Sequence, residues 1–262
     1  MNDITIQALG QSGFLLSSKT GRFLFDPYLS NIVAEKYGAD FERLIPTPLK
    51  PEMIKNIDAI FITHIHDDHC DVKTLSGLLK TNPHLKIYAP EICLPTLLEA
   101  GFSKDQIAVA VESEAEVKKD VKVRSVPAAH LQIERSNAGS LNCVGYILEI
   151  DGVVFYHSGD TMPHDEISQA LPKSIDLAFL PINERNFFRD KRGIIGNLTL
   201  REALTWVEEL GIKKWIPMHW DMFKLNSVFP EELNFLAKKM DVENKIQWLT
   251  CGQVMALEVK NR

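Results

Sequence analysis

Asp58-Ala-Ile-Phe-Ile-Thr-His64-Ile-His66-Asp67-Asp68-His69-Cys70-Asp71 is the stretch that decides the fold and the function of this chain. Apolar residues 59–62 predict a buried strand, and three histidines and three aspartates follow within eight positions. Alternate side chains of an extended segment share a face, so His64 and His66 are expected to approach one ion. Asp68 and His69 then face a second ion. The alternative is a polar surface loop rich in histidine, which accounts less well for H-x-H-x-D-H directly after an apolar strand.

The composition is that of a globular protein. The chain has 262 residues, of which 45% are hydrophobic and 24% charged. A formal net charge of −6 disfavours a nucleic-acid partner, which needs a concentrated basic face. The first residues lack the features of a signal peptide, no apolar run has the length of a membrane span, and four scattered cysteines form no C-x-x-C pair. We therefore expect a cytoplasmic protein with free thiols and no membrane partner.

Alternating and continuous apolar segments predict strands, and segments with helical periodicity predict helices. The expected strands are 3–9, 14–16, 22–26, 59–62, 85–88, 106–111, 115–118, 120–126, 144–150, 153–157, 176–181, 215–218, 246–249 and 253–259. The expected helices are 71–80, with Asp71 as N-cap, 91–100, 166–171, 199–210 and 231–240. Residues 31–50 are expected to form an irregular insertion.

Strands followed by helices in both halves predict an α/β fold. We expect two mixed sheets packed face to face with helices outside, an αββα sandwich in one domain over residues 1–262. The segments 14–26 and 146–160 are similar, since each is a hairpin with a glycine turn that ends on an acidic residue. They indicate either a weak internal duplication or a chance match of composition.

Further residues that suit a metal ion follow other predicted strands. His130, Asp160 and His219 each lie at the C-terminal end of a strand or just beyond it, and loops at that edge of an α/β sheet meet on one side. Imidazole and carboxylate ligands suit zinc, iron, nickel and manganese. We assign one ion to His64, His66 and His130, the other to Asp68, His69 and His219, and a bridging position to Asp160.

The order of these motifs resembles the metallo-β-lactamase superfamily: Thr63-His-x-His-x-Asp-His69, then His130, Ser158-Gly-Asp160 and His219. Within it the chain is most similar to the L-ascorbate-6-phosphate lactonase group. The stretches that carry this resemblance are Gln11-Ser-Gly-Phe14, Asp26-Pro-Tyr-Leu-Ser30, His157-Ser-Gly-Asp-Thr161, Leu180-Pro-Ile-Asn183, Ile195-Gly-Asn197 and Pro217-Met-His-Trp-Asp-Met-Phe223. The resemblance implies a cytoplasmic, metal-dependent lactone hydrolase that acts on a phosphorylated sugar acid, often as a homo-oligomer. It adds weight to manganese beside zinc and iron.

Two ions at this spacing favour hydrolysis. Ions about 3.5–4 Å apart share a bridging water and lower its pKa, so that hydroxide attacks a carbonyl carbon. We expect Asp160 to hold the two ions together, and Asp68 or a metal-bound water to protonate the departing oxygen. No serine or cysteine triad is evident.

Some nearby residues have a supporting or a purely structural interpretation. Asp26 is expected to orient an imidazole ligand, with a surface turn as the alternative. His157 is expected either behind the ligands or in the core. Asp67 is expected to brace the loop, and His164 to begin a helix at the surface. Cys70 is not needed as a ligand.

A phosphorylated substrate needs an anion site. Asn183 and Arg185 follow the strand 176–181, and Arg189, Lys191 and Arg192 come soon after. Guanidinium groups bind phosphate with two hydrogen bonds, so Arg185 is the expected phosphate contact. The alternative is a solvated basic loop. The prediction is that Arg185→Ala raises KM for a phosphorylated lactone far more than for an uncharged one.

Other functions use the same residues. A dinuclear phosphodiesterase is the main alternative, although the acidic charge and the lack of an aromatic and basic platform disfavour a nucleic-acid substrate. A non-catalytic metal protein is disfavoured, because closed structural sites seldom use seven mixed ligands. A flavin-linked oxygen reductase would need a second domain.

Overall fold

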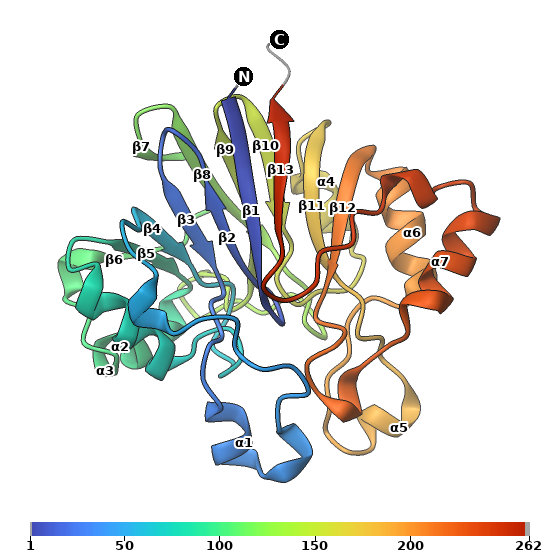
Figure 1. Ribbon diagram of the computed structural model, residues 1–262, viewed down its shortest axis with the longest axis horizontal. Coiled ribbons are helices and arrows are strands. Elements are labelled where there is room, and N and C mark those ends of the chain that lie inside the picture. The colour runs from blue at the N-terminus through green and yellow to red at the C-terminus, as the bar shows by residue number, and fades with distance from the viewer. Residues whose placement is uncertain (1, 260–262) are drawn as a thin grey trace.

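The computed structural model describes residues 2–259 and contains two β-sheets (Figure 1). The first sheet has seven strands in the order β13-β1-β2-β3-β4-β5-β6. Their bounds are β1 Asn2–Gly10, β2 Gly13–Ser17, β3 Arg22–Phe25, β4 Ala59–Phe61, β5 Lys86–Ala89, β6 Ile107–Val109 and β13 Val254–Val259. The second sheet has six strands in the order β12-β11-β10-β9-β8-β7. Their bounds are β7 Ala115–Lys118, β8 Val121–Pro127, β9 Val144–Ile150, β10 Val153–His157, β11 Ile175–Pro181 and β12 Ile212–Met218.

Helices lie on the outer faces of the sheets, as Figure 1 shows. These are α2 Val72–Thr81, α3 Leu94–Glu99, α4 Asp165–Ala170, α6 Leu200–Glu209 and α7 Pro230–Lys239. Two further helices, α1 Ile32–Tyr37 and α5 Phe187–Asp190, lie at one end of the sandwich. Asp71 caps α2 as expected, because its carboxylate accepts hydrogen bonds from the backbone N–H groups of Lys73 and Thr74. Within residues 2–259, no helix is both long and apolar enough to cross a bilayer.

The alternation of side chains along the strands produces the layers. In β3, Phe23 and Phe25 point into the core between the two sheets, whereas Leu24 packs under the outer helices α2 and α3. In the second sheet, Phe155 and Phe179 face the same central core, and α6 and α7 cover the opposite face. The predicted αββα sandwich is therefore confirmed.

The two sheets repeat one pairing order. Strands β1 to β5 pair as antiparallel, antiparallel, parallel and parallel, and β8 to β12 pair in the same way. The equivalence extends into the turns, since Asp26 N–H donates to Phe61 O and Ser158 N–H donates to Phe179 O. This repeat agrees with the internal duplication that the two hairpins suggested.

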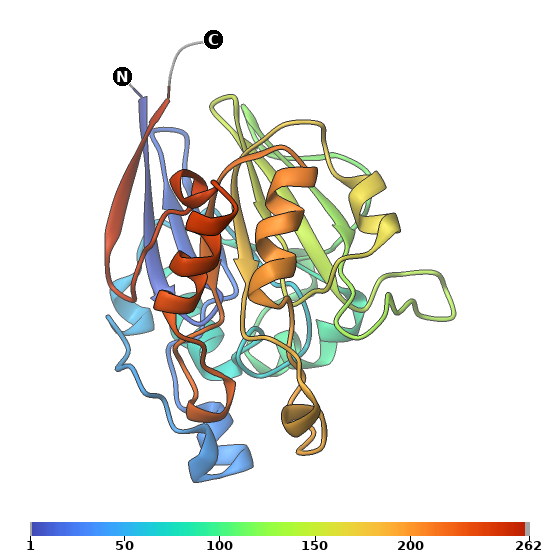
Figure 2. The same ribbon diagram turned by 90° about the vertical axis from the view of Figure 1, so that its right-hand side faces the viewer.

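Two expectations about local structure were wrong, and one short helix was not predicted. Residues 246–249 form no strand, because only Ile246 makes a bridge, to Trp215, after a single 3₁₀ turn. The segment 31–50 contains the short helix α1, and the basic segment after Arg185 contains α5, whose first turn is capped by Asn186. Both helices are shorter than two full turns and leave little periodicity to detect. Figure 2 places α1 and α5 at the end of the sandwich opposite the two chain termini.

Candidate metal centre

Four strand ends bring the seven predicted ligands together at the α1 and α5 end of the sandwich. The loop after β4 carries His64, His66, Asp68 and His69, while His130 follows β8, Asp160 follows β10 and His219 follows β12. Three overlapping groups have ligand atoms within 4.8 Å of one another: His64–His66–His130, His64–His69–Asp160 and Asp68–His69–His219. The structure thus gathers the residues on which the sequence analysis rests.

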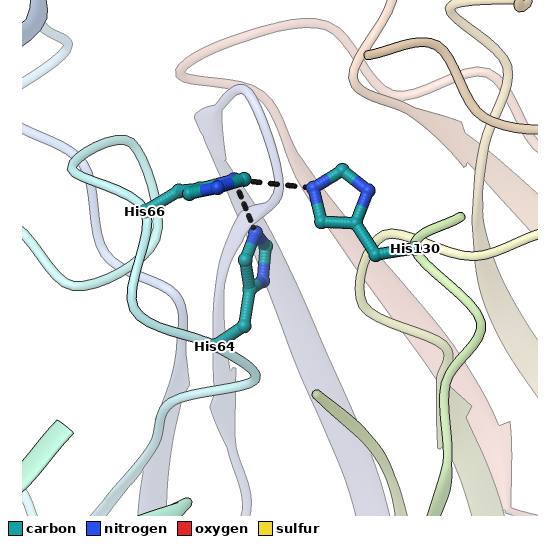
Figure 3. Close-up of side chains that lie close together, drawn as sticks. All are labelled: His64, His66 and His130. Atoms are coloured by element: carbon teal, nitrogen blue, oxygen red, sulfur yellow. Dashed lines mark hydrogen bonds between the residues drawn. The ribbon is translucent and has the colours of Figure 1, made fainter. Parts of the chain in front are cut away.

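Three histidine rings form the first group (Figure 3). His64 Nε2 and His130 Nε2 each lie 3.1 Å from His66 Nδ1. Ring nitrogens that face one another at this distance need a proton or a cation between their lone pairs. His64 and His130 are buried and His66 is exposed, so the group opens to solvent on one side.

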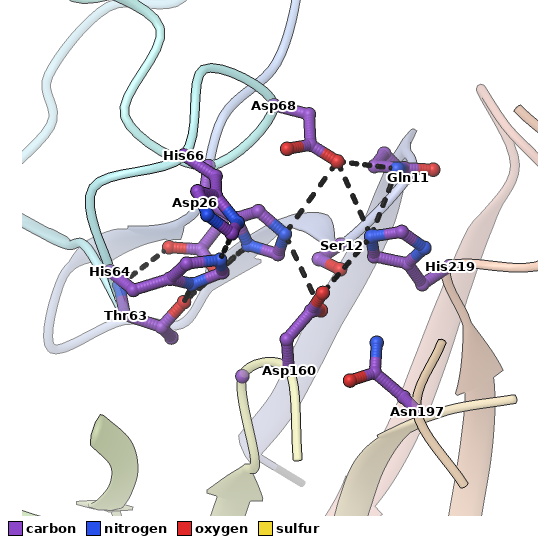
Figure 4. A network of polar contacts seen from close by, with 12 residues as sticks. Gln11, Ser12, Asp26, Thr63, His64, His66, Asp68, Asp160, Asn197 and His219 are labelled. Atoms are coloured by element: carbon purple, nitrogen blue, oxygen red, sulfur yellow. Dashed lines mark hydrogen bonds and ion pairs between the residues drawn. The ribbon is translucent and has the colours of Figure 1, made fainter. Parts of the chain in front are cut away.

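Carboxylates connect the first group to the second (Figure 4). Asp68 Oδ2 lies 3.3 Å from His219 Nε2 and 3.7 Å from His69 Nε2. Asp160 Oδ1 lies 3.4 Å from His69 Nε2, and its Oδ2 lies 3.3 Å from His219 Nε2 and 3.7 Å from His130 Nε2. Asp160 therefore contacts residues of both groups, which is what a bridging ligand requires.

The buried polar atoms of the cluster fit divalent cations. His69 Nε2 and Asp160 Oδ1 are both buried and have no hydrogen-bond partner, although buried polar atoms are almost always satisfied. The two atoms lie 3.4 Å apart. Together the groups supply five imidazoles and two carboxylates, a donor set that suits zinc, manganese or iron.

Asp26 holds the loop from behind. It is fully buried, and its Oδ1 accepts the Thr63 N–H at 2.8 Å. Its Oδ2 accepts Thr63 Oγ1 at 2.6 Å and lies 2.7 Å from His69 Nδ1. A hydrogen on His69 Nδ1 leaves the Nε2 lone pair directed at the cluster, so this contact fixes the ring in the state that binds a metal.

Protonation of the cluster is set by burial and by the carboxylates. Burial, together with neighbouring histidines, holds the pKa of His64 well below its usual range. Burial also lowers the pKa of His69, but Asp160, Asp68 and Asp26 outweigh it and raise that pKa to about 10. Burial raises the pKa of Asp68, yet His69 and His219 outweigh it and hold the pKa well below its usual range. Burial raises the pKa of Asp160 as well, but His219, His69 and His130 outweigh it and lower that pKa, so both carboxylates are ionised. The raised pKa of His69 means that a metal binding at its Nε2 would displace a proton.

Gln11 is a buried polar residue that the sequence analysis did not assign to the site. It lies between β1 and β2 with a left-handed φ of 54°. Its Nε2 lies 2.7 Å from Asp68 Oδ2 and 3.0 Å from His219 Nε2. Its carbonyl oxygen accepts the backbone N–H of His219 at 3.0 Å. The signal in the sequence was the polar pair Gln11-Ser12 inside the glycine-bounded turn 10–13, at the end of a strand.

The turn that carries Asp160 depends on Gly159 and His157. Gly159 has a φ of 61°, and a Cβ there would lie 2.8 Å from Thr63 Cβ and from Val144 O. Its N–H donates to His157 Nδ1 at 3.3 Å, and His157 Nε2 donates to Ser12 O at 2.9 Å. His157 stacks on Phe25 and has no described contact with the histidine cluster. It is thus a core residue that supports the turn from behind.

A cavity of about 260 Å³ lies against the cluster. Its polar wall consists of His66, Asp67, Asp68, His130, Asp160, His219 and Asn226, and its other wall of Val33, Tyr37, Phe41, Gly193, Ile194, Ile195 and Phe223. Asp67 accepts hydrogen bonds from Lys36 at 2.6 Å and Tyr37 at 2.9 Å, so it fastens α1 to the metal loop. This agrees with the bracing role expected of it.

The two expected substrate contacts do not line this cavity. Arg185 forms an ion pair with Glu202 and donates to Asn197 O at 2.9 Å. Asn183 is fully buried, and its Nδ2 donates to Asn226 Oδ1 at 3.0 Å, so Asn226 stands between it and the cavity. The sequence places both residues near a strand end, but their side chains are engaged by neighbours that lie far away in the chain.

The remaining residues have structural roles. Cys70 is fully buried among the apolar residues beneath α2. His164 is exposed and caps α4 by accepting the Glu166 N–H at 3.1 Å, as expected for a helix start at the surface.

Comparisons with known proteins agree with this geometry. The model of the Beta-lactamase superfamily domain matches residues 21–220. A probable L-ascorbate-6-phosphate lactonase UlaG of Escherichia fergusonii is 26% identical over 208 residues, which cover 74% of this chain but 57% of that relative. The chain thus spans little more than half the length of this curated relative.

Two solved structures share the fold over nearly the whole chain. Igni18, a metallo hydrolase of Ignicoccus hospitalis, has a TM-score of 0.70 at 22% identity and covers 98% of this chain and 100% of its own. An isothiocyanate hydrolase from Delia radicum gut bacteria has a TM-score of 0.75 at 18% identity, with coverage of 97% and 100%. On the family match and this shared fold, the chain belongs to the metallo-β-lactamase superfamily and has relatives of the UlaG type.

Proposed function

We propose that this protein is a metal-dependent hydrolase that opens a lactone. The observation that carries the proposal is the arrangement of two ligand groups, joined by Asp160, on one wall of a cavity. Divalent ions held there would supply an activated water and polarise the carbonyl of the substrate. The names of the UlaG-type relatives support a lactone as the substrate.

The residues of the chain have separate tasks in this reaction. His64, His66 and His130 would hold one ion, Asp68, His69 and His219 the other, and Asp160 both. Asp26 keeps the His69 ring in the binding tautomer, and Gln11 holds Asp68 by the 2.7 Å contact. Asp68 also lines the cavity, so its carboxylate is available to take a proton and pass it to the departing oxygen.

The main support among the residues for a phosphate group on the substrate was the availability of Arg185. The family resemblance implies an L-ascorbate-6-phosphate-like lactone, and the sequence predicts Arg185 as the phosphate contact, but Arg185 forms an ion pair with Glu202 instead. We therefore keep the lactone ring in the proposal. Whether its substituent is charged or uncharged has to be inferred from the residues that line the cavity.

The test is metal analysis of the purified protein, followed by assays with manganese, zinc and iron restored in turn. Turnover of five- and six-membered lactones, with no cleavage of bis-p-nitrophenyl phosphate, would support a lactonase. Cleavage of the phosphodiester alone would favour the dinuclear phosphodiesterase that the sequence left open. Metal-loaded protein inert towards lactones, thioesters and phosphodiesters would contradict both enzymatic proposals.

Cytoplasmic location and assembly into a homo-oligomer are parts of the same proposal. The four cysteines are free in the structure, in keeping with a reducing compartment. Light scattering during gel filtration tests the assembly.

A further inference from the structure

The wall of the cavity that faces the histidine cluster is apolar. Val33, Tyr37 and Phe41 come from α1 and the 3₁₀ turn after it, and Ile194, Ile195 and Phe223 come from the loops after α5 and β12. Phe41 and Phe223 pack edge to face, with ring centroids 5.9 Å apart and an interplanar angle of 78°. An apolar wall of this kind gains most from a substrate group that leaves water on binding.

No lysine or arginine is among the described residues that line the cavity. Several neighbouring cations have other partners: Lys36 binds Asp67, and Arg185 binds Glu202. Arg189 donates to the carbonyl oxygens of Asn183, Glu184 and Ser227. The side chains of Lys191, Arg192 and Lys224 are exposed and have no described partner, but none of the three lines the cavity. A phosphate group inside the cavity would therefore meet no side-chain cation.

A relay of three amides presents one neutral donor to the cavity. Asn197 Nδ2 donates to Asn183 Oδ1 at 2.9 Å, and Asn183 Nδ2 donates to Asn226 Oδ1 at 3.0 Å. All three side chains are buried, and Asn226 is the member that lines the cavity. Because its oxygen already accepts from Asn183, its N–H groups are the part left for a ligand.

We propose that the cavity binds an uncharged lactone or ester with an apolar substituent, and that Asn226 donates a hydrogen bond to one of its oxygens. The substituent packs against Phe41, Phe223 and Ile194, and the ring faces the ligand cluster. Asn183 and Asn197 are positioning residues, since they act through Asn226. The inference rests on the proposed lactonase function and names the class of lactone.

Hydrolysis-resistant lactams test the cavity separately from turnover. We would titrate the metal-loaded protein calorimetrically with γ-lactams that carry hydrogen, butyl, dihydroxyethyl or phosphorylated dihydroxyethyl substituents. The butyl lactam should bind at least about tenfold more tightly than the phosphorylated one. In an apolar pocket a single methylene group already changes the affinity by about tenfold or more. Phe41→Ser should remove that preference without changing the affinity for the unsubstituted lactam. The matched control is Phe187→Ser, because Phe187 is an exposed phenylalanine outside the cavity.

Asn226 has its own pair of variants. Asn226→Asp keeps the acceptor for Asn183 and removes the donor, so it should weaken binding of every uncharged lactam by about tenfold or more. Asn226→Leu should do the same, and Asn137→Leu at an exposed site should not. Thermal unfolding of each variant shows whether it folds, and Asn226→Asp carries the test if Asn226→Leu does not.

The outcomes separate the two proposals. Equal or tighter binding of the phosphorylated lactam would overturn the inference, above all if Arg192→Ala abolished that binding. The predicted order of lactams without turnover of any matching lactone would uphold the ligand class and contradict the lactonase reaction. Unchanged affinities in both Asn226 variants would remove Asn226 as the donor.

Discussion

The side-chain amide of Gln11 lies 2.7 Å from Oδ2 of Asp68, although 57 positions separate the two residues. The backbone carbonyl oxygen of Gln11 also accepts a hydrogen bond from the backbone N–H of His219. One residue in a turn of the first sheet therefore orients two predicted ligands that come from different sheets. Contacts of this kind direct the lone pairs of ligands towards a metal and are costly to remove.

Gln11→Met should weaken divalent-ion binding by about 10- to 100-fold, since Met keeps the length of the side chain but not its amide. Competition with a chelator of known affinity measures the change. The control is Gln132→Met at an exposed position. An unchanged ion affinity would show that Asp68 and His219 are ordered without Gln11.

His66→Ala should reduce the number of bound ions per chain from two to one, because it removes the ring nitrogen that lies between His64 and His130. Elemental analysis after dialysis against excess metal gives the stoichiometry. His84→Ala, at an exposed turn, should keep both ions. Two ions retained in the His66 variant would contradict the assignment of the three-histidine group.

Arg185→Ala should change KM for phosphorylated and uncharged lactones by the same small factor, which reverses the prediction from sequence. The reason is that its guanidinium binds Glu202 and the Asn197 carbonyl outside the cavity. Partly exposed ion pairs such as this one, whose side chains are 32% and 33% exposed, contribute about 1 kcal/mol or less to stability. Steady-state kinetics with both substrates decides the matter, and a selective rise in KM for the phosphorylated lactone would restore the original assignment.

His157 should make the metal-free protein less stable in acid. Burial lowers its pKa in the folded state, so below about pH 6.5 the unfolded chain takes up a proton that the folded chain does not. The free energy of unfolding should thus fall by about 1 kcal/mol between pH 7.5 and 5.5 on account of this residue. His157→Gln should lose that share of the pH dependence. Urea unfolding at the two pH values in a chelator tests it, and equal slopes for both proteins would contradict it.

Asp71→Ala should lower the free energy of unfolding by about 2 kcal/mol, since it removes the cap of α2. The carboxylate also accepts Thr74 Oγ1 at 2.5 Å, and Thr74 Oγ1 in turn accepts the Leu29 N–H. Asp105→Ala at an exposed site is the control. Urea titration measures both, and equal effects would show that the cap contributes little.

The sequence predicts those parts of the fold that have a local period. Alternation in segments such as 22–26 assigns one face to the central core, and the H-x-H-x-D-H motif follows its strand as expected. Short elements cannot be predicted in this way. Helix α5, for example, spans four residues, which are too few to show a helical period. Segment 246–249 looks like a strand by composition, but its only bridge is the one at Ile246.

Contacts between distant residues set the rest of the site. Gln11 and His219 are 208 positions apart, and nothing in the spacing of either predicts that they touch. Arg185 looked available because its partner Glu202 lies 17 positions further along the chain, on helix α6. Asn226 ends the 3₁₀ turn Lys224–Asn226, which carries no motif, and the amide relay is what identifies it.

The imidazole of His69 lies between carboxylates from both halves of the chain, with Asp26 Oδ2 2.7 Å from Nδ1 and Asp160 Oδ1 3.4 Å from Nε2. The two acids follow β3 and β10, which are corresponding strands of the repeated pairing order. A shift of one sheet along the other would move one acid away from the ring while the other stayed. Both contacts of the His69 ring therefore form only when the two sheets pack together correctly. A molecule with every strand formed but with the sheets packed out of register would not assemble the metal centre.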